Sequence, residues 1–246
     1  MKKMYRRLFG MGLLCLGVAG CSSSNPDVLR HIVMDKCVPN SMNTNSPKPC
    51  AEVNTEKGYV VLKDLNGPLQ YLIMPTAKLD GMESPELLNK TTTNFLWKAW
   101  QSRHFMSEKL GKPIPENVVS LTINSAYART QNHLHIHLSC TASDVQTTLL
   151  QQEKQIGTQW KELSTKLKGE YYMARRITAK EFEQKSPFLW LTDIPNASGE
   201  MGKYSVAVTP ASNGDFILLA TKHQWLPFNK AASEDLQDHS CKLLGL

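Results

Sequence analysis

Short apolar runs in the middle of the chain have the length and composition of β-strands. GYVVLKDL (58–65) and LQYLIMP (69–75) are rich in β-branched and aromatic residues, and Asn66-Gly67-Pro68 separates them. Such a break between two apolar runs is typical of a turn, so we expect two neighbouring strands. VVSLTIN (118–124) and NHLHIHLSC (132–140) are further runs of this kind, which we interpret as a β-hairpin with a long connection.

Two segments show the period of amphipathic helices instead. Between Thr93 and Leu110 apolar residues recur at near-helical intervals, with Thr93 or Asn94 available as a cap and Gly111 just past the end. A second helix is predicted from Ser143 to Leu167, and Gly169 follows it. Its apolar residues share one helical face: Val145, Leu149, Ile156, Trp160, Leu163 and Leu167.

The last third of the chain mixes strand and helix signals. EYYMARRI (170–177) is strand-like, and Thr178 and Glu181 have the spacing of a helix capping box. KYSVAVTP (203–210) and DFILLAT (215–221) read as a β-hairpin. Strands and helices in this order predict an α+β fold with an antiparallel sheet.

The other segments are less regular. Residues 38–57 are rich in Pro, Asn, Ser and Thr and read as an irregular loop. A final helix is predicted to begin at Ser233 and end near Leu244. Two apolar clusters, FLWL (188–191) and WLPF (225–228), are explained more simply by core packing than by contact with lipid.

The N-terminus reads as a targeting segment. MKKMYRR carries four positive charges and no negative one, and the uncharged run LFGMGLLCLGVAG follows. This order is typical of a signal peptide, and the run is short for a membrane span, which needs about 20 apolar residues. Val18-Ala19-Gly20-Cys21 resembles the site at which bacterial lipoprotein precursors are cut and acylated. Cys21 is therefore the candidate lipidation site, with an uncleaved anchor as the alternative.

Charge and cysteines narrow the class of protein. The chain carries a net charge of +6, and removal of the four N-terminal positives leaves 6 − 4 = +2, which is no signature of nucleic-acid binding. Four cysteines follow Cys21, and an oxidising compartment favours two disulfides with three possible connectivities. We expect Cys37–Cys50 and Cys140–Cys241, with buried free thiols as the alternative. A zinc site is not expected, because no pair has C-x-x-C spacing.

Three histidines alternate with aliphatic residues, as His133, His135 and His137 with Leu134, Ile136 and Leu138. Because side chains alternate across a strand, the histidines should share one face while the aliphatic residues face the core. Neighbouring histidines would be about 6.5–7 Å apart, from twice the rise of a strand. Such a row can line a groove that holds an extended substrate.

Three interpretations of this row compete. Surface histidines without a role are the weakest, because an exposed strand face normally carries mixed polar residues. A metal site would need a further ligand, for which His104, His223 and His239 are available without a telling spacing. In nucleophilic catalysis on phosphorus, one histidine nitrogen forms a phosphoramidate, while flanking imidazoles hold oxygens and protonate the leaving group.

HLHIHLS resembles the His-φ-His-φ-His signature of the histidine-triad superfamily of nucleotide hydrolases and transferases, where φ is apolar. Motifs across nearly the whole chain after Cys21 resemble one branch more closely, the bacterial CDP-diacylglycerol pyrophosphatases. They are CVPN…PCAEV, GYVVLKDLNGPLQYL, INS…RTQNH.HIH.SC, ARR.T and QDH.C. The resemblance implies a histidine-triad-like antiparallel sheet with packed helices, extended by a C-terminal α+β segment.

On this basis we divide the chain into four parts. Residues 1–21 are a signal peptide or membrane anchor, and residues 22–57 are a tether and a disulfide-stapled loop. Residues 58–142 are the catalytic core. Residues 143–246 are a C-terminal α+β extension packed on that core.

The resemblance implies hydrolysis of the pyrophosphate bond of CDP-diacylglycerol to CMP and phosphatidate, without a metal or other cofactor. His135 would take the CMP phosphoryl group, His137 would contact the phosphate and assist the leaving group, and His133 would orient His135. Gln70 stands where many superfamily members carry a further histidine, and it can donate a hydrogen bond but carries no charge. The other residues implied to bind substrate are Asp64 and Leu65 at the ribose, and Asn124, Thr130 and Gln131 at ribose or phosphate oxygens.

The implied substrate is a membrane lipid, so we expect a protein that faces the periplasm and is anchored in the bacterial cell envelope, at the inner membrane. No nucleic-acid partner is expected, and both a monomer and a homodimer are compatible with the sequence. A metal-binding envelope lipoprotein and a non-catalytic nucleotide-binding module are the alternative functions.

Overall fold

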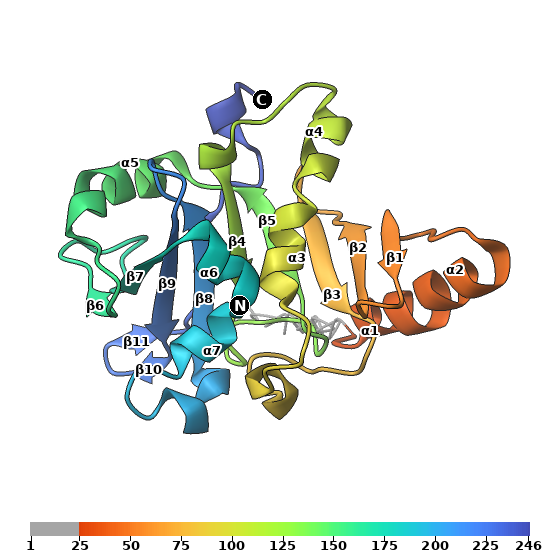
Figure 1. The fold of residues 1–246 in the computed structure, drawn as a ribbon, viewed down its shortest axis with the longest axis horizontal. Coiled ribbons are helices and arrows are strands. Elements are labelled where there is room, and N and C mark those ends of the chain that lie inside the picture. Colours follow the sequence, from red (N-terminus) through yellow and green to blue (C-terminus); the bar gives the residue numbers. More distant parts are fainter. Residues whose placement is uncertain (1–24) are drawn as a thin grey trace, which may run out of the picture.

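The computed structural model describes residues 25–246, so the predicted signal peptide and Cys21 lie outside the described residues. Nine strands form one sheet in the order β1-β2-β3-β5-β4-β8-β9-β7-β6, and every neighbouring pair is antiparallel (Figure 1). The α+β class with an antiparallel sheet is therefore confirmed. The strands are β1 (Glu52–Asn54), β2 (Tyr59–Lys63), β3 (Tyr71–Pro75), β4 (Val119–Ile123), β5 (Ile136–Cys140), β6 (Lys161–Glu162), β7 (Met173–Ile177), β8 (Tyr204–Pro210) and β9 (Phe216–Lys222), followed by a separate hairpin of β10 (Gln224–Trp225) and β11 (Phe228–Asn229).

The helices are short. The α-helices are α1 (Val28–Ile32), α2 (Val38–Thr44), α3 (Phe95–Gln101), α4 (His104–Leu110), α5 (Ser143–Gln152), α6 (Ala179–Gln184) and α7 (Pro187–Leu191). A π-helical turn, η1 (Val33–Cys37), joins α1 to α2. The 3-10 turns are η2 (Pro85–Leu88), η3 (Glu116–Val118), η4 (Glu153–Gln155), η5 (Ala197–Gly199), η6 (Met201–Lys203), η7 (Ser233–Leu236) and η8 (Lys242–Leu244).

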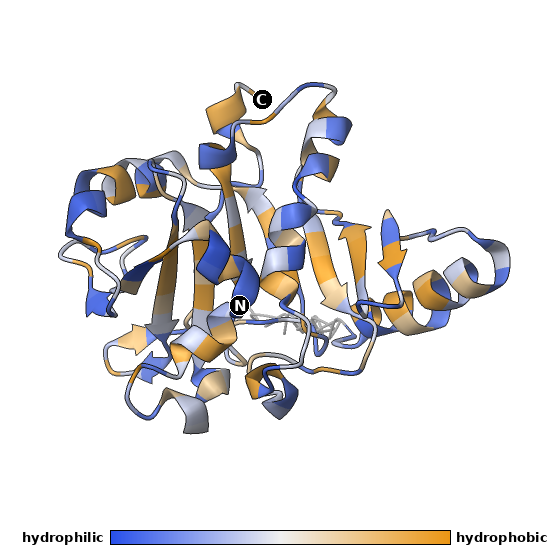
Figure 2. Cartoon of the chain, in the orientation of Figure 1, coloured by the Kyte–Doolittle hydropathy of each residue, from blue (hydrophilic) through white to orange (hydrophobic). Residues whose placement is uncertain are grey.

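The main core lies between one face of the sheet and the helices α3, α6 and α7, which cross in front of the strands in Figure 1. Buried aromatic residues such as Phe95, Phe182 and Phe188 come from these helices. Leu121 of β4 and Leu138 of β5 belong to the same cluster. Figure 2 shows the matching distribution of hydropathy: the strands are mostly apolar, and the helices carry polar residues on their outer sides.

The opposite face of the sheet is covered by two separate groups of residues. The turn η1 shares a buried cluster with alternate residues of β2 and β3, among them Val60 and Met74. Helix α5 shares another with β7, β8 and β9, which includes Leu149 and Leu219. Between these clusters, the same face of β4 and β5 carries polar side chains: Ser120, Thr122, His137 and Ser139. The fold thus leaves a polar strip at the middle of an otherwise apolar sheet.

Most predicted strands are confirmed, with trimmed ends. The pairs β2–β3, β4–β5 and β8–β9 are antiparallel neighbours, as expected. The capping box of Thr178 and Glu181 is formed, and Asn94 caps α3 by accepting a hydrogen bond from the Trp97 amide. Both expected disulfides, Cys37–Cys50 and Cys140–Cys241, are present.

The two long helices were predicted wrongly. The segment 93–110 breaks between α3 and α4, where the amides of Arg103 and Phe105 donate to the carbonyls three residues earlier, Trp100 and Ser102, in place of the helical i→i−4 pattern. The helix predicted for 143–167 ends at Gln152, whose Oε1 accepts bonds from the Ser164 amide and hydroxyl and turns the chain back. Its later apolar residues reach the core from non-helical backbone instead.

The irregular loop and the final helix were also predicted wrongly. Within 38–57 the chain forms α2 and β1, joined by the loop that Cys37–Cys50 closes. The C-terminal segment forms only η7 and η8, because Gln237 between them pairs with Thr141 in a β-bridge. Of the two clusters expected in the core, Phe188 and Leu191 are buried, whereas Trp225, Leu226 and Phe228 are exposed.

Candidate active site

The three histidines lie where β5 enters the sheet. His137 is within β5, opposite Leu72 of β3 and Thr122 of β4, while His133 and His135 immediately precede the strand. Leu134, Ile136 and Leu138 are buried in the main core. The alternation is therefore confirmed, and the histidines occupy the polar strip between the two apolar clusters. All three are buried, so the row is not a solvated surface.

His135 is held in one orientation by its own backbone. Its Nδ1–H donates to the carbonyl oxygen of His133 at 2.6 Å, which leaves Nε2 as the nitrogen with a free lone pair. Burial lowers the pKa of His135, and the bond to His133 with the charges of Glu234 and Asp64 opposes this only in part. A neutral, oriented imidazole has the properties of a nucleophile.

His137 lies beside His135, with ring centroids 4.9 Å apart. The rings are thus closer than the strand spacing of about 6.5–7 Å suggests, and they meet edge to face with their planes at 69°. Burial and then the charge of His135 lower the pKa of His137 to about 4, against the opposing charges of Glu234 and Asp64. Nε2 of His137 is buried without a hydrogen-bond partner among residues 25–246. An unpaired buried nitrogen is costly, and a substrate oxygen would satisfy it.

Glu234, on η7, was not expected from the sequence. Its Oε1 lies 3.3 Å from Nδ1 of His137 and 3.1 Å from Nε2 of His239, and its Oε2 accepts a bond from the Asn124 amide at 2.9 Å. Burial acts to raise the pKa of Glu234, but the bond from His239, the charge of His137 and the Asn124 amide lower it to about 2. Glu234 is therefore ionised, and its negative charge favours the protonated form of the neighbouring His137.

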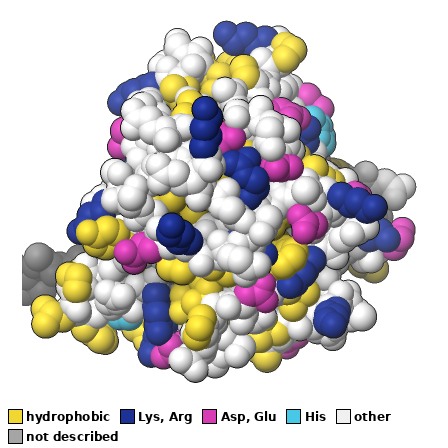
Figure 3. Space-filling view, turned by 60° about the vertical axis from the view of Figure 1, so that its left-hand side comes forward, with side chains coloured by type: hydrophobic (Ala, Val, Ile, Leu, Met, Phe, Trp, Pro, Cys, Tyr) yellow, Lys and Arg dark blue, Asp and Glu magenta, His cyan; other side chains and the backbone are white. Residues whose placement is uncertain are grey.

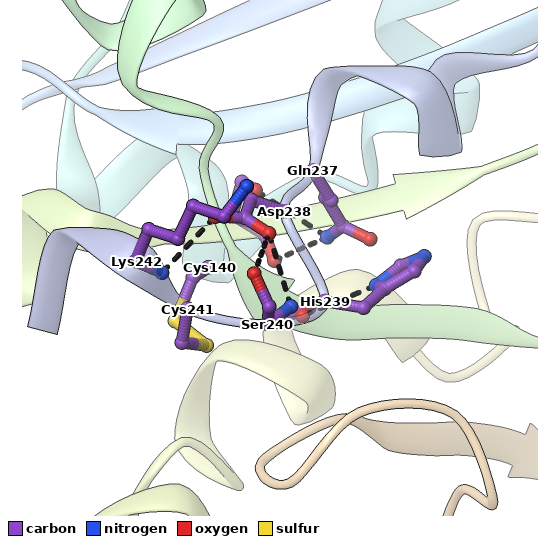
Figure 4. Close-up of a disulfide and its surroundings, with 9 residues drawn as sticks. Cys140, Gln237, Asp238, His239, Ser240, Cys241 and Lys242 are labelled. Atoms are coloured by element: carbon purple, nitrogen blue, oxygen red, sulfur yellow. Dashed lines mark hydrogen bonds between the residues drawn. A yellow bond between two sulfur atoms is a disulfide. The ribbon is translucent and has the colours of Figure 1, made fainter. Parts of the chain in front are cut away.

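The segment that carries Glu234 is fixed to the sheet downstream. Nε2 of Gln237 donates to the backbone oxygens of Ser120 and His137, and Cys241 is bonded to Cys140. Figure 4 shows that the side chains of Gln237 and His239 point away from this disulfide. The motif QDH.C was visible in the sequence and could have drawn attention to this segment, although nothing in it singles out Glu234.

Gln70 is completely buried and connects β3 to the site. Its Nε2 donates to Oδ2 of Asp64 at 2.5 Å and lies 3.3 Å from Nδ1 of His137. Asp64 follows β2, so the turn between the first two predicted strands delivers a carboxylate to the histidines. His137 is thus placed between two carboxylates, one in direct contact and one through Gln70.

His133 makes a different contact from its two neighbours. Its Nε2–H donates to the carbonyl oxygen of Pro75 at 3.0 Å, and burial lowers its pKa to about 4. The side chain is fully buried. It therefore fastens the start of β5 to the end of β3, while its backbone carbonyl orients His135.

A cavity of about 370 Å³ opens onto His135 and His137. Asp64, Asn124, Thr130 and Gln131 line it, as does Glu234. Val28 and Leu29 of α1 form part of its wall, where Gln131 accepts a hydrogen bond from the Leu29 amide at 3.2 Å. Leu65 is 99% exposed and, like Gln70, is not among the lining residues. A larger cavity of about 520 Å³, behind Ala126 and Tyr127, contains no histidine.

The charge in the smaller cavity is unusual for a phosphate site. Among the described residues that line it, none is Lys or Arg, and two are carboxylates. The imidazoles are the groups that can become positive there. In residues 25–246, no group of three or more His, Cys, Asp or Glu side chains is arranged to hold a metal ion.

The site therefore combines an oriented neutral imidazole, a second imidazole paired with an ionised carboxylate, and a cavity of nucleotide size. The family model of CDP-diacylglycerol pyrophosphatase matches residues 24–245. The chain belongs to this family. Because the match spans nearly the whole chain, the protein is a hydrolase that acts on a pyrophosphate bond, with CDP-diacylglycerol as the lipid substrate. The family gives the metal-binding and non-catalytic alternatives no support.

The membrane lipid substrate raises the question of how the protein meets a bilayer. Over residues 25–246, no helix has the length and apolar composition needed to cross a membrane.

Proposed function

We propose that hydrolysis of CDP-diacylglycerol proceeds through a covalent CMP–histidine intermediate on His135. The observation that supports this most directly is the 2.6 Å hydrogen bond from Nδ1 of His135 to the His133 carbonyl. It fixes the proton on Nδ1, so Nε2 offers its lone pair to a substrate in the cavity. Burial acts in the same direction, because it keeps the imidazole neutral.

In the first step, Nε2 of His135 attacks the phosphorus of the CMP group. A P–N bond forms, and the bond from that phosphorus to the oxygen bridging to phosphatidate breaks. The leaving oxygen takes a proton from Nε2–H of His137, so phosphatidate departs as its monoester. In the second step, water attacks the same phosphorus while His137 takes one of its protons, which releases CMP and restores both imidazoles.

His137 must carry a proton on both nitrogens for the first step, although its pKa in the free protein is about 4. Pyrophosphate brings negative charge into the cavity, which favours the protonated form of a neighbouring imidazole. The negative charge of Glu234, whose Oε1 lies 3.3 Å from Nδ1, adds to this effect. The two carboxylates thus favour a positive charge on His137, which stands in for the Lys or Arg that the described lining residues do not include.

Polar groups around the cavity suit the nucleoside. Asp64 from the β2–β3 turn is placed to accept ribose hydroxyls, and Thr130 offers its hydroxyl to ribose or phosphate oxygens. Gln131 is committed to the Leu29 amide and the Asn25 carbonyl, so we assign it to holding that segment at the wall of the cavity. Asn124 is committed to Glu234 through both its amide nitrogen and its carbonyl oxygen, so we assign it to holding that carboxylate. The His-φ-His-φ-His arrangement, with the nucleophile oriented by its own backbone, favours membership of the histidine-triad superfamily.

The covalent intermediate can be tested with CDP-diacylglycerol labelled with ³²P in the CMP phosphate. Wild-type protein quenched in alkali during turnover should retain label on His135, since phosphoramidates survive alkali. His135→Ala should neither bind label nor release CMP. His104→Ala, which changes an exposed histidine on α4, is the matched control and should behave as wild type. Normal CMP release by His135→Ala would exclude the mechanism.

We further place the protein at the periplasmic side of the inner membrane, with Cys21 acylated. The motif Val18-Ala19-Gly20-Cys21 and the basic, then apolar, N-terminus support this. Radioactive palmitate should label the wild-type chain in cells but not a Cys21→Ser variant. Equal labelling of both would favour another mode of attachment.

A further inference from the structure

The hairpin β10–β11 carries an exposed apolar tip, made of Trp225, Leu226, Pro227 and Phe228. Trp225 is 75% exposed and Leu226 is 93% exposed, and Phe228 is exposed as well. Tyr127, from the β4–β5 loop, lies beside them and is also exposed. Isolated exposed apolar residues need no explanation, but a cluster of four large ones marks an interaction site.

The tip is held rigidly rather than left loose. Tyr127 stacks on His223, with ring centroids 3.8 Å apart and planes at 13°, and Trp225 packs edge-on against the same ring at 4.9 Å. Nδ1–H of His223 donates to the Asn229 carbonyl at 2.6 Å. The protein therefore fixes these aromatic rings in place while their apolar surface faces outward.

The tip lies at the same edge of the sheet as the active site. β9 is antiparallel to β8, which is antiparallel to β4, so β9 ends at the edge where β4 ends and β5 begins. The Ser125 hydroxyl donates to the Lys230 carbonyl at 2.6 Å and ties the hairpin to the β4–β5 loop. That same loop supplies Thr130 and Gln131 to the cavity. In Figure 1, β10, β11 and α1 all lie toward the lower edge.

The chain outside the described residues joins at this edge too. Nε2 of Gln131 donates to the carbonyl oxygen of Asn25 at 3.1 Å, and the Asn132 amide donates to that of Pro26 at 2.6 Å. Residues 1–24 therefore connect to the fold beside the cavity. An attachment of the preceding residues to a membrane would bring this edge of the sheet toward the bilayer.

The dimensions of the cavity call for such an arrangement. At about 370 Å³ it is at the low end of the range of about 300–1,000 Å³ for small-molecule sites. It suits a nucleotide with its phosphates and leaves two acyl chains outside. These chains are most stable in the hydrocarbon of the bilayer, so the cavity must come to the membrane surface while the substrate stays embedded.

The chemistry of the tip fits the boundary between headgroups and acyl chains. Tryptophan and tyrosine favour that boundary, because their rings combine apolar faces with a polar group. Lys203, Lys222 and Lys230 flank the tip against Glu200 and Asp235, which leaves a local charge of 3 − 2 = +1. On the face seen in Figure 3, apolar side chains gather mainly in the lower half, with lysine and arginine side chains among them.

We propose that the apolar tip of β10–β11, with Tyr127, inserts into the bilayer interface and places the mouth of the catalytic cavity over the headgroup of its lipid substrate. This rests on the proposed action on CDP-diacylglycerol within a membrane. The partner that the tip contacts is lipid, and neither a second copy of the chain nor another protein.

The test uses the full-length chain reconstituted into vesicles of phosphatidylethanolamine and phosphatidylglycerol. Two substrates are compared, long-chain CDP-diacylglycerol embedded in the vesicles and a short-chain, water-soluble CDP-diacylglycerol.

Leu226→Glu should lower the rate on the embedded substrate by roughly 10-fold or more, the scale of a lost apolar side-chain insertion. Its rate on the soluble substrate should stay within about twofold of wild type, because the tip takes no part in the chemistry. Leu150→Glu, at another exposed leucine on α5, is the matched control and should leave both rates unchanged.

A second measurement reports contact directly. Phospholipids brominated along their acyl chains should quench part of the tryptophan fluorescence of wild-type protein, and Trp225→Phe should remove most of that quenching. Equal rates of Leu226→Glu and wild type on embedded lipid, or equal quenching of Trp225→Phe and wild type, would overturn the proposal. A change in oligomeric state of Leu226→Glu without loss of quenching would overturn it too and assign the tip to a second copy. A wild-type protein inactive on both substrates would instead refute the proposed function.

Discussion

Nδ1 of His137 lies 3.3 Å from Oε1 of Glu234, a residue close to the C-terminus and therefore far from His137 along the chain. The same carboxylate oxygen is 3.1 Å from Nε2 of His239. His137 thus has an ionised partner that favours its protonated form, while burial favours the neutral form. The balance of these two effects decides whether His137 can protonate the leaving group.

Glu234→Gln should weaken the acid role of His137. Loss of the carboxylate removes a charge that raises the pKa of His137, so the protonated form disappears at lower pH and the alkaline limb of kcat moves down. We expect kcat to fall on the order of 10²-fold, within the range for loss of general-acid catalysis, with a smaller change in KM. Steady-state pH profiles measure both.

Glu153→Gln is the matched control for this variant, because Glu153 is another largely buried, ion-paired glutamate, bound to Arg176 and Ser212 away from the cavity. It should leave the pH profile unchanged. An unshifted profile for Glu234→Gln would show that Glu234 does not act through His137.

Gln70 offers a second way to alter the charge around His137. Gln70→Glu replaces a donor to Asp64 with a carboxyl group at the same position, 2.5 Å from Oδ2 in the native contact. Two ionised carboxylates cannot share this space, but one shared proton restores the bond. We expect kcat/KM to be lowered on the order of 10-fold at pH 8 and to recover partly at pH 6.

Gln70→Leu provides the comparison, since it removes the same bond without adding a titrating group. Its loss of activity should not recover as the pH is lowered. If both variants showed the same dependence on pH, the effect would come from packing and not from the contact with Asp64.

The strands and the histidine row could be predicted because their signals are local. The β-branched runs set β2, β3, β4, β8 and β9, and alternation alone put His137 on the face opposite Leu138. Glu234 could not be predicted in this way, because its approach to His137 depends on the bridge of Gln237 to Thr141 and on Cys140–Cys241. These contacts join segments far apart in the sequence, where no spacing rule applies.

The helices were harder to predict for a related reason. Leu163 and Leu167 lie at helical intervals from Leu149, yet they reach the same cluster from non-helical backbone. A core requires only that apolar side chains are buried in it. The period of the sequence pattern does not determine the backbone conformation that places them there. The side chain of Gln152 binds the Ser164 amide and hydroxyl and so holds the chain after α5 in its non-helical course.

Stability should fall as the pH is lowered from about 6.5 to 4. Burial lowers the pKa values of His133 and His137 to about 4 in the folded protein, from 6.5. Between these values the unfolded chain binds protons that the folded protein does not, so unfolding is favoured by acid. Each histidine contributes up to about 3 kcal/mol to this loss.

His133→Gln should reduce the acid sensitivity, because glutamine can donate to the Pro75 carbonyl but does not titrate in this range. Urea unfolding at pH 7.5 and pH 4.5 measures the difference. His104→Gln, at an exposed position, should retain the wild-type difference. An acid sensitivity unchanged by His133→Gln would mean that other groups govern it.

The disulfide Cys140–Cys241 should matter for catalysis as well as for stability. It closes a loop with a sequence separation of 101 residues, for which chain entropy predicts a stabilisation of about 5 kcal/mol. It also fastens the segment of Gln237 and His239 to Cys140 at the end of β5 (Figure 4). We expect Cys140→Ser/Cys241→Ser to lose stability and, at a temperature where it remains folded, to lose kcat by roughly the factor predicted for Glu234→Gln, on the order of 10²-fold. Cys37→Ser/Cys50→Ser, which opens the shorter loop beside α2, should lose stability with a much smaller effect on kcat. Equal losses of kcat in the two double variants would show that the effect comes from general destabilisation and not from release of Glu234.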